Sequence, residues 1–345
     1  MMIAGMMANE RPEKDWYRKN RPKKGNYHRR ANWNDYQLPR IYMITMVADK
    51  EVTPLSEVDW QDGNFVVKLS NMGLLVDEEL KGWDARWKEL TVGYRVIMPD
   101  HIHFILNVRE RLGEKFSKVI SDFKGGCTRK VRQILSASGR NVDKLSFFEK
   151  NFHDRILTGK GQLDAMISYI KDNPRRYLMK KRYPDLFRRI NMMKIGGTEL
   201  SAFGNLFLLR EFCKEPVIIR SHYSEEYLKE LRERWRGVSD MGGVLVSPFI
   251  SEKEKSVMEE TLAAGGKVIV IRDNGFPERF KPSGKLFDYC LEGQLLLIGP
   301  ATYETSRGFL TREKCWEMNR IAEKICNISP ETMLSLTGLS SARPK

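Results

Sequence analysis

Apolar and polar positions along residues 40–183 follow short, regular patterns that predict a small mixed domain. Apolar runs with a period of two indicate strands, and amphipathic stretches indicate helices. In chain order the predicted elements are a strand at 41–48, a helix at 72–90, strands at 91–98 and 101–108, a helix at 112–135, a strand at 145–157 and a helix at 162–172. This order predicts an α+β ferredoxin-like domain, an antiparallel sheet with helices packed on one face.

Residues beyond Gly196–Gly197 have a different pattern. Four apolar runs, PVIIR, GVLVS, KVIVIR and QLLLIG, have the length of buried strands, and helical stretches lie between the first three. Such alternation predicts βαβ units and an α/β Rossmann-like domain with a parallel sheet. Ser251 and Glu254 have the spacing of a capping box at the start of one helix. The expected organisation is a basic, partly flexible arm at 1–38, a first domain at 39–195 and a second domain at 196–345.

Basic residues exceed acidic residues mainly in the first part of the chain. Residues 1–200 contain 38 Lys and Arg against 25 Asp and Glu, whereas residues 201–345 contain 21 against 20, and the whole chain has a net charge of +14. A basic domain joined to a neutral one indicates that the first domain meets a polyanion, for which nucleic acid is the default candidate. A positive face without a partner is the alternative.

Composition favours a soluble globular protein. Hydrophobic residues make up 41% of the chain, and no apolar run approaches the roughly 20 residues of a membrane-spanning helix. The N-terminal residues have no signal-peptide pattern, so we expect a cytoplasmic protein without a membrane partner. The five cysteines are scattered and form no CxxC pair, which predicts reduced thiols.

His101 and His103 are the most specific local feature. Residues two apart on a strand point to the same face, so both imidazoles converge on one region and could hold a divalent metal ion. The turn of Pro99 and Asp100 directly before them fits a tight hairpin between two strands. A coincidental pair of surface or core histidines is the alternative.

Tyr169 and Asn173 are four residues apart on a predicted helix and therefore share one face. Tyr169 can supply a phenolate nucleophile, and Asn173 can supply a hard oxygen ligand to the same metal ion. We expect Pro174 to force the chain out of regular helix at Asn173. The alternative is that Tyr169 is an ordinary aromatic of an amphipathic helix, beside Ile170.

The order of these motifs closely resembles that of the single-tyrosine HUH transposases, above all the insertion-sequence-200-like and REP-associated tyrosine transposases. The resemblance spans residues 40–183 and rests on MPDHIHFIL, FKGGCTRKVRQI with the pair Phe123–Lys124, FFEKNFHDRIL, and the helix containing YIKDNP. It implies that His101, His103 and Asn173 bind a divalent metal ion, Mg²⁺ or Mn²⁺, and that Tyr169 is the nucleophile.

The resemblance also implies a reaction and its partners. A tyrosine transposase cleaves and rejoins single-stranded or hairpin DNA through a 5′-phosphotyrosine, and a homodimer is one expected assembly. Two other functions stay open. One is a DNA-binding regulator without turnover, and the other is a protein whose α/β domain senses a nucleotide and controls the nuclease domain.

Further residues are candidates for contact with the DNA or for support of the site. The predicted phosphate contacts are the cations Lys124, Arg129, Lys130, Arg132, Lys171, Arg175 and Arg176, for which a solvated helix face is the alternative. His153, Asp154 and Arg155 resemble a run that the family often shows before the tyrosine helix. They could bind the strand or orient the site, or form a structural turn instead.

The second domain loosely resembles the Rossmann-like domain of DNA-processing protein A. Ligands of such sheets bind beyond the carboxyl ends of the strands, which nominates Ser221, Ser247, Asp273 and Asn274. No GxGxxG motif or P-loop occurs in the sequence. A nucleotide-binding domain and a purely structural or protein-binding domain therefore remain equal alternatives.

Overall fold

The computed structural model describes residues 30–332 except 279 and 307. The chain divides into two compact units at Asn173–Pro174, inside a helix. The expected boundary at 195/196 lies about 20 residues later than this division. Gly196 and Gly197 have φ values of 53° and 83° and form the two-residue turn of a β-hairpin within the second unit. The change of pattern at these glycines thus coincides with a hairpin turn.

The first unit contains the predicted antiparallel sheet, with strands in the order β4-β5-β1-β6. Its elements are β1 (Arg40–Val47), η1 (Lys50–Val52), β2 (Ser56–Gln61), β3 (Asn64–Leu69), α2 (Asn71–Arg86), β4 (Leu90–Ile97), β5 (His101–Val108), α3 (Phe116–Ala137), β6 (His153–Leu157) and the N-terminal part of α4 (Gln162–Arg182). Without the small β2–β3 hairpin this is a βαββαβ chain, the connectivity of ferredoxin-like domains.

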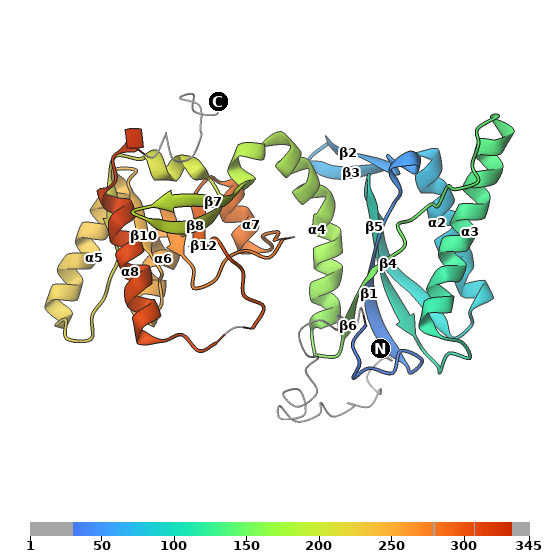
Figure 1. Ribbon diagram of the computed structural model, residues 1–345, viewed down its shortest axis with the longest axis horizontal. Coiled ribbons are helices and arrows are strands. Elements are labelled where there is room, and N and C mark those ends of the chain that lie inside the picture. Colours follow the sequence, from blue (N-terminus) through green and yellow to red (C-terminus); the bar gives the residue numbers. More distant parts are fainter. Residues whose placement is uncertain (1–29, 279, 307, 333–345) are drawn as a thin grey trace. The chain divides into compact units, whose positions relative to one another are not determined.

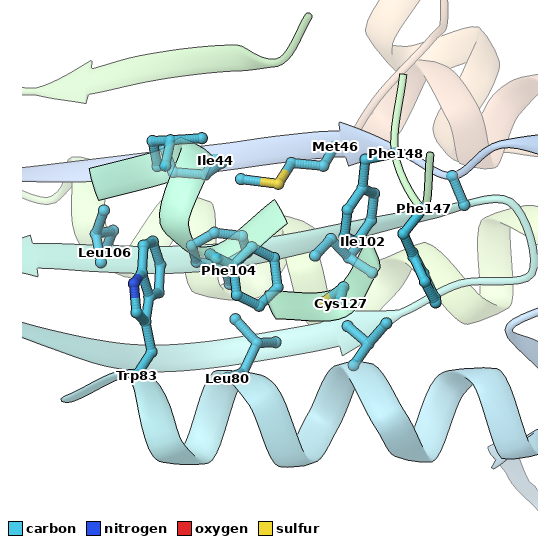
Figure 2. Close-up of a cluster of buried hydrophobic side chains, with 14 of the residues drawn as sticks. Ile44, Met46, Leu80, Trp83, Ile102, Phe104, Leu106, Cys127, Phe147 and Phe148 are labelled. Atoms are coloured by element: carbon cyan, nitrogen blue, oxygen red, sulfur yellow. The ribbon is translucent and has the colours of Figure 1, made fainter. Parts of the chain in front are cut away.

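Strand alternation divides the sheet into two different faces. Tyr42, Ile44 and Met46 of β1 are fully buried, together with Ile102 and Phe104 of β5. Figure 2 shows Ile44, Ile102 and Phe104 between the sheet and the helical side chains of the core. Because successive side chains of a strand point to opposite faces, His101 and His103 lie on the other side of the sheet from this core.

Helices cover both faces of this sheet. Helices α2 and α3 contribute Leu80, Trp83 and Phe123 to the core on one face. The N-terminal part of α4 lies over the opposite face, where the ring of Tyr169 contacts His103 (Figure 1). The expectation that all helices pack on one face was therefore wrong for α4, because amphipathic periodicity shows that a helix has an apolar side but not which face of the sheet it covers.

The local differences from the predicted elements have identifiable causes. The β2–β3 hairpin was not predicted, although Asp62 and Gly63 at its turn both have positive φ, as a two-residue Asp-Gly turn requires. The strand expected at 145–157 is shorter, because only His153–Leu157 pairs along β1 and Phe148 forms just an isolated bridge with Ala48.

Helix α4 continues through Pro174 as far as Arg182, so the expected departure from helix at Asn173 does not occur. Proline lacks an N–H group and therefore removes one hydrogen bond from a helix. The helix nevertheless continues, and the division between the two units falls at this residue.

The second unit contains a sheet of mixed direction, with the order β7-β8-β12-β11-β10-β9. Its elements are the C-terminal part of α4, η2 (Pro184–Phe187), β7 (Arg188–Ile195), β8 (Thr198–Gly204), η3 (Leu206–Arg210), β9 (Lys214–Pro216), α5 (Glu225–Asp240), β10 (Val244–Ser247), α6 (Glu252–Ala263), β11 (Lys267–Ile271), α7 (Lys285–Leu291), β12 (Leu295–Pro300) and α8 (Arg312–Asn327).

Four of these six strands, β9 to β12, are parallel, and β8 and β7 extend the sheet in antiparallel fashion. The prediction of an all-parallel sheet is therefore confirmed only in part. Helix α8 packs on one face, and α5, α6 and α7 pack on the other. The capping box of Ser251 and Glu254 is present at the start of α6. The predicted strand PVIIR is paired only at its start, and residues beyond Val217 leave the sheet.

Candidate active site

The two histidines of β5 face each other on the sheet surface beneath α4. Their Nε2 atoms are 3.1 Å apart, and the angle between their ring planes is 78°. Each Nδ1 atom has an oxygen neighbour: Asp100 Oδ1 lies 2.6 Å from His101 Nδ1, and Thr45 Oγ1 lies 2.7 Å from His103 Nδ1. The outer nitrogens are thus engaged, and the inner nitrogens converge on one point.

These neighbours restrict the tautomers of the two neutral imidazoles. A carboxylate only accepts hydrogen bonds, so His101 Nδ1 carries its proton toward Asp100 and His101 Nε2 presents a lone pair. The Thr45 hydroxyl can either donate or accept. When it accepts from His103 Nδ1, both Nε2 lone pairs face each other, and a cation bound between them would stabilise this arrangement; when it donates, His103 Nε2 carries the proton and donates to His101 Nε2.

The donor set fits a divalent metal ion. Two nitrogen ligands about 2.1 Å from one ion, at about a right angle, are about 3 Å apart, close to the separation found here. Oxygen partners on the outer nitrogens are the usual supports of metal-binding imidazoles. Among the residues that the structure describes, no three His, Cys, Asp or Glu side chains form a group that could hold a metal ion. A third protein ligand would therefore be of another type, such as the amide of Asn173.

Tyr169 lies beside this pair. Its ring centroid is 5.7 Å from that of His103, with an edge-to-face angle of 71°. One helical turn later, the amide nitrogen of Asn173 donates to the Tyr169 carbonyl at 2.9 Å. The amide oxygen of Asn173 is then the atom that can bind a cation. The structure thus brings His101, His103 and Tyr169 together and places Asn173 on the adjacent turn of α4.

The run His153–Asp154–Arg155 is divided between the two faces of the sheet. Thr45 of β1 is directly opposite His103 of β5 and also opposite His153 of β6. Directly opposite residues point to the same face of a sheet, so all three side chains lie on the face of the candidate site. Arg155, two residues further along β6, lies on the same face. Asp154 points to the opposite face, where its partners are Arg30 and Tyr36.

Asp154 holds the described end of the N-terminal arm. It forms an ion pair with Arg30 and accepts a hydrogen bond from the Tyr36 hydroxyl at 2.8 Å. Tyr36 stacks on Tyr42, with centroids 5.6 Å apart, and burial raises its pKa, which Asp154 raises further. Residues 30–38 are therefore packed against the domain, and the rest of the expected basic arm, residues 1–29, lies outside the described residues.

Three of the four cations of α3 predicted to bind DNA form internal contacts. Lys124 donates to the carbonyls of residues 149, 150 and 151, Arg132 donates to those of 143 and 145, and Lys130 pairs with Glu79 at 2.7 Å. These contacts join α3 to the following loop and to α2. Contact of these residues, and of Arg129, with DNA remains a prediction.

The cations of α4 differ in their surroundings. Lys171 is exposed, with its ammonium 5.4 Å from the ring centre of Tyr94. Arg175 pairs with Asp288 at 2.6 Å, and Arg176 is buried and donates to the carbonyl of Pro282. Of these three predicted DNA contacts, Lys171 is therefore the exposed one, whereas Arg175 and Arg176 have internal partners.

Of the four residues nominated in the second domain, Ser221 alone lines the cavity of about 650 Å³ that the described residues form at the carboxyl ends of β9 and β10. Ser247 is fully buried and accepts a hydrogen bond from the Phe249 amide. Asn274 is bound through both ends of its amide to the backbone of Glu304. Asp273 directly precedes it and does not line that cavity.

Thr45 and Asp100 were not identified from the sequence as site residues. Thr45 is a lone polar residue in the apolar run IYMITMVA, and Asp100 directly precedes His101. A polar residue in an otherwise apolar strand is the one local signal that could have indicated Thr45. Its partner became evident only from the register of β1 and β5.

A convergent histidine pair beside a helical tyrosine, on an antiparallel sheet, offers the donor atoms and the hydroxyl that a phosphoryl-transfer site needs. Residues 84–173 match the family model described as "Transposase IS200 like". This match includes His101, His103, Tyr169 and Asn173, and it confirms the resemblance to tyrosine transposases for that segment. It also supports a function in DNA processing. The resemblance of the second domain to DNA-processing protein A is not confirmed.

Solved structures show further similarity to the chain. A REP-associated tyrosine transposase bound to a REP hairpin is 15% identical, with 43% of this chain and 74% of that chain covered and a TM-score of 0.31. A candidate transposase from Deinococcus radiodurans is 11% identical, with coverages of 40% and 94% and a TM-score of 0.26. No curated protein matches the chain. Within the described residues, no helix has the length and apolar character needed to cross a membrane.

Proposed function

We propose that this protein cleaves and rejoins single-stranded DNA through a covalent bond to Tyr169. The observation that carries the proposal is the contact of the Tyr169 ring with His103, whose Nε2 faces that of His101 at 3.1 Å. A potential nucleophile thus lies beside two convergent nitrogen ligands, within the segment that matches the transposase family.

The reaction balances without an external energy source. The Tyr169 hydroxyl oxygen attacks the phosphorus in line and loses its proton. The new bond joins the tyrosine oxygen to this phosphorus, which stays attached to the 5′ oxygen of the downstream strand. The bond from phosphorus to the 3′ oxygen breaks, and that oxygen takes up a proton. Attack by a 3′-hydroxyl on the phosphotyrosine reverses these steps and joins the strands.

His101, His103 and Asn173 would hold the divalent ion, Mg²⁺ or Mn²⁺. When bound, that ion polarises a non-bridging oxygen of the scissile phosphate. Asp100 and Thr45 orient the two imidazoles through their outer nitrogens. Imidazole ligands favour transition ions over Mg²⁺, so Mn²⁺ is the preferred ion for the first assay.

The test incubates labelled single-stranded DNA and hairpins from the flanks of the gene with protein and Mn²⁺, and resolves covalent adducts on a denaturing gel. Wild type is expected to form adducts, whereas Tyr169→Phe retains DNA binding and forms none. Tyr177→Phe, a change on the same helix, is the matched control and is expected to behave like wild type.

Two outcomes would contradict this proposal. Adducts formed by Tyr169→Phe would assign the nucleophile to another residue. Tight DNA binding by wild type without adducts, for every substrate and with both ions, would favour a DNA-binding regulator instead.

A further inference from the structure

A cavity of about 650 Å³ lies in the second unit, at the carboxyl ends of β9 and β10. One wall comes from the residues that follow these strands, including Arg220 and Ser251, and the other comes from α8, including Trp316. Ligands of parallel α/β sheets bind at this edge, and the volume is within the usual range for a small-molecule site. All of these residues belong to one unit.

The charge of the cavity favours an anion. Arg220, Arg312 and Arg320 line it, and within the described part of the chain none of these guanidiniums forms an ion pair. By contrast, arginines of α5 such as Arg232 and Arg234 form ion pairs, with Glu260 of α6 and Glu215 of β9. Three unpaired guanidiniums around one concavity are suited to binding phosphate oxygens.

Two acidic side chains also line the cavity, but the carboxylate of one of them already accepts hydrogen bonds from backbone amides. The carboxylate of Glu254 is buried and accepts hydrogen bonds from the amides of Ile219, Ile250 and Ser251, at 3.0, 2.9 and 3.0 Å. This carboxylate occupies the N-terminus of α6, where a phosphate would bind in many α/β proteins. A phosphate in this cavity would therefore bind at the arginines instead. Glu323, on α8, is the second acid.

The remaining lining suits a planar, hydrogen-bonding group. Trp316 is 56% exposed at the cavity and offers a flat surface, over which the Arg312 guanidinium lies 5.1 Å from the ring centre. The side-chain oxygen of Asn319 is buried and, among the described residues, has no hydrogen-bond partner. It can accept a hydrogen bond from a sugar hydroxyl or an exocyclic amine. Stacking on tryptophan is a common mode of binding a nucleobase.

We infer that this cavity binds a nucleotide, with its phosphate at the three arginines and its base against Trp316. The nucleotide is either free or the terminal residue of a DNA strand, because both have the same chemistry. This inference is independent of the reaction proposed for Tyr169, which lies in the other unit.

The test is calorimetric titration of the full-length protein with AMP, GMP, CMP and UMP, with adenosine and inorganic phosphate, and with a 5′-phosphorylated thymidine oligonucleotide. We expect at least one nucleotide or the oligonucleotide to bind at least tenfold more tightly than adenosine or phosphate. Binding of mononucleotides assigns the site to free nucleotides, and binding of the oligonucleotide alone assigns it to DNA ends.

Substitutions locate the binding site. Arg312→Ala and Trp316→Ala should each weaken binding about tenfold or more, since one stacked base or one guanidinium contact contributes at least that factor. Arg236→Ala, which removes an exposed arginine of α5 outside the cavity, is the matched control and should leave binding unchanged. Absence of binding by every probe at millimolar concentration would overturn the inference, as would unchanged binding by both cavity variants.

Discussion

Thr45 and His103 are paired across β1 and β5, with Thr45 Oγ1 2.7 Å from His103 Nδ1. The contact orients the imidazole and allows either of its tautomers. Thr45→Val has nearly the same shape without the hydroxyl, so it should weaken Mn²⁺ binding about 10- to 100-fold while leaving the fold intact. Calorimetric titration with Mn²⁺ measures this change. Thr45→Ser should restore most of the affinity, and equal affinities for wild type and the Val variant would show that the hydroxyl does not support a metal ligand.

The two histidines should contribute more to metal-dependent cleavage than the amide of helix α4. Imidazole nitrogens bind Mn²⁺ more strongly than a single amide oxygen, so His101→Ala and His103→Ala should abolish cleavage, and Asn173→Ala should reduce it less. Cleavage rates across a Mn²⁺ titration test this order. Arg236→Ala, a change at an exposed residue of α5 in the second unit, should cleave like wild type. Full activity of both histidine variants in saturating Mn²⁺ would reduce the pair to a structural role.

Asp154 and Arg155 are neighbours whose substitution should have different effects, because they point to opposite faces of β6. Asp154→Ala removes the buried partner of Arg30 and Tyr36 and should lower the free energy of unfolding by about 2 kcal/mol. Arg155→Ala should change it by less than about 0.5 kcal/mol but weaken binding of single-stranded DNA. Urea unfolding and a DNA-binding titration measure the two effects. The reverse assignment of effects would show that the strand register does not determine these roles.

Lys124 should make the stability of the protein depend on pH in the alkaline range. Burial and the neighbouring charge of Arg30 lower the pKa of Lys124 to about 8, with Glu149 acting in the opposite direction. In the unfolded chain the pKa is about 10.5, so between the two values the unfolded state binds more protons and stability rises with pH.

The comparison variant for this effect is Lys124→Met, which keeps the length of the side chain but cannot titrate. The free energy of unfolding of wild type relative to this variant should increase between pH 7.5 and pH 9.5. Urea unfolding at both pH values provides the measurement, and other titrating groups cancel in the difference. A difference that stays constant with pH would contradict the lowered pKa.

Much of the candidate site could be predicted from the sequence, because its parts depend on local periodicity. The side chains of His101 and His103 share a face of any strand that contains them, and those of Tyr169 and Asn173 share a face of any helix. The same locality explains why β5 and the capping box of α6 were predicted correctly. The Asp62–Gly63 turn of the β2–β3 hairpin is an equally local signal in the sequence.

Other features depended on contacts between residues far apart in the chain. A lysine or arginine has the same appearance in the sequence whether it faces solvent or donates to backbone carbonyls, so charge alone could not show that Lys124 and Arg132 join α3 to the following loop. Likewise, Gly196 and Gly197 form a hairpin turn only because β7 and β8 pair with each other in the second sheet.

The sequence by itself determined the identity of the chemical groups and their local spacing: two imidazoles on one strand, and a tyrosine and an asparagine one turn apart on a helix. Only the tertiary structure decided that helix α4 covers the face of the sheet with the histidines, that Thr45 supports His103 and that Asp154 holds the arm. The physical reason is that periodicity specifies which side chains share a face, whereas strand register and the burial of apolar surface between distant segments decide what that face meets.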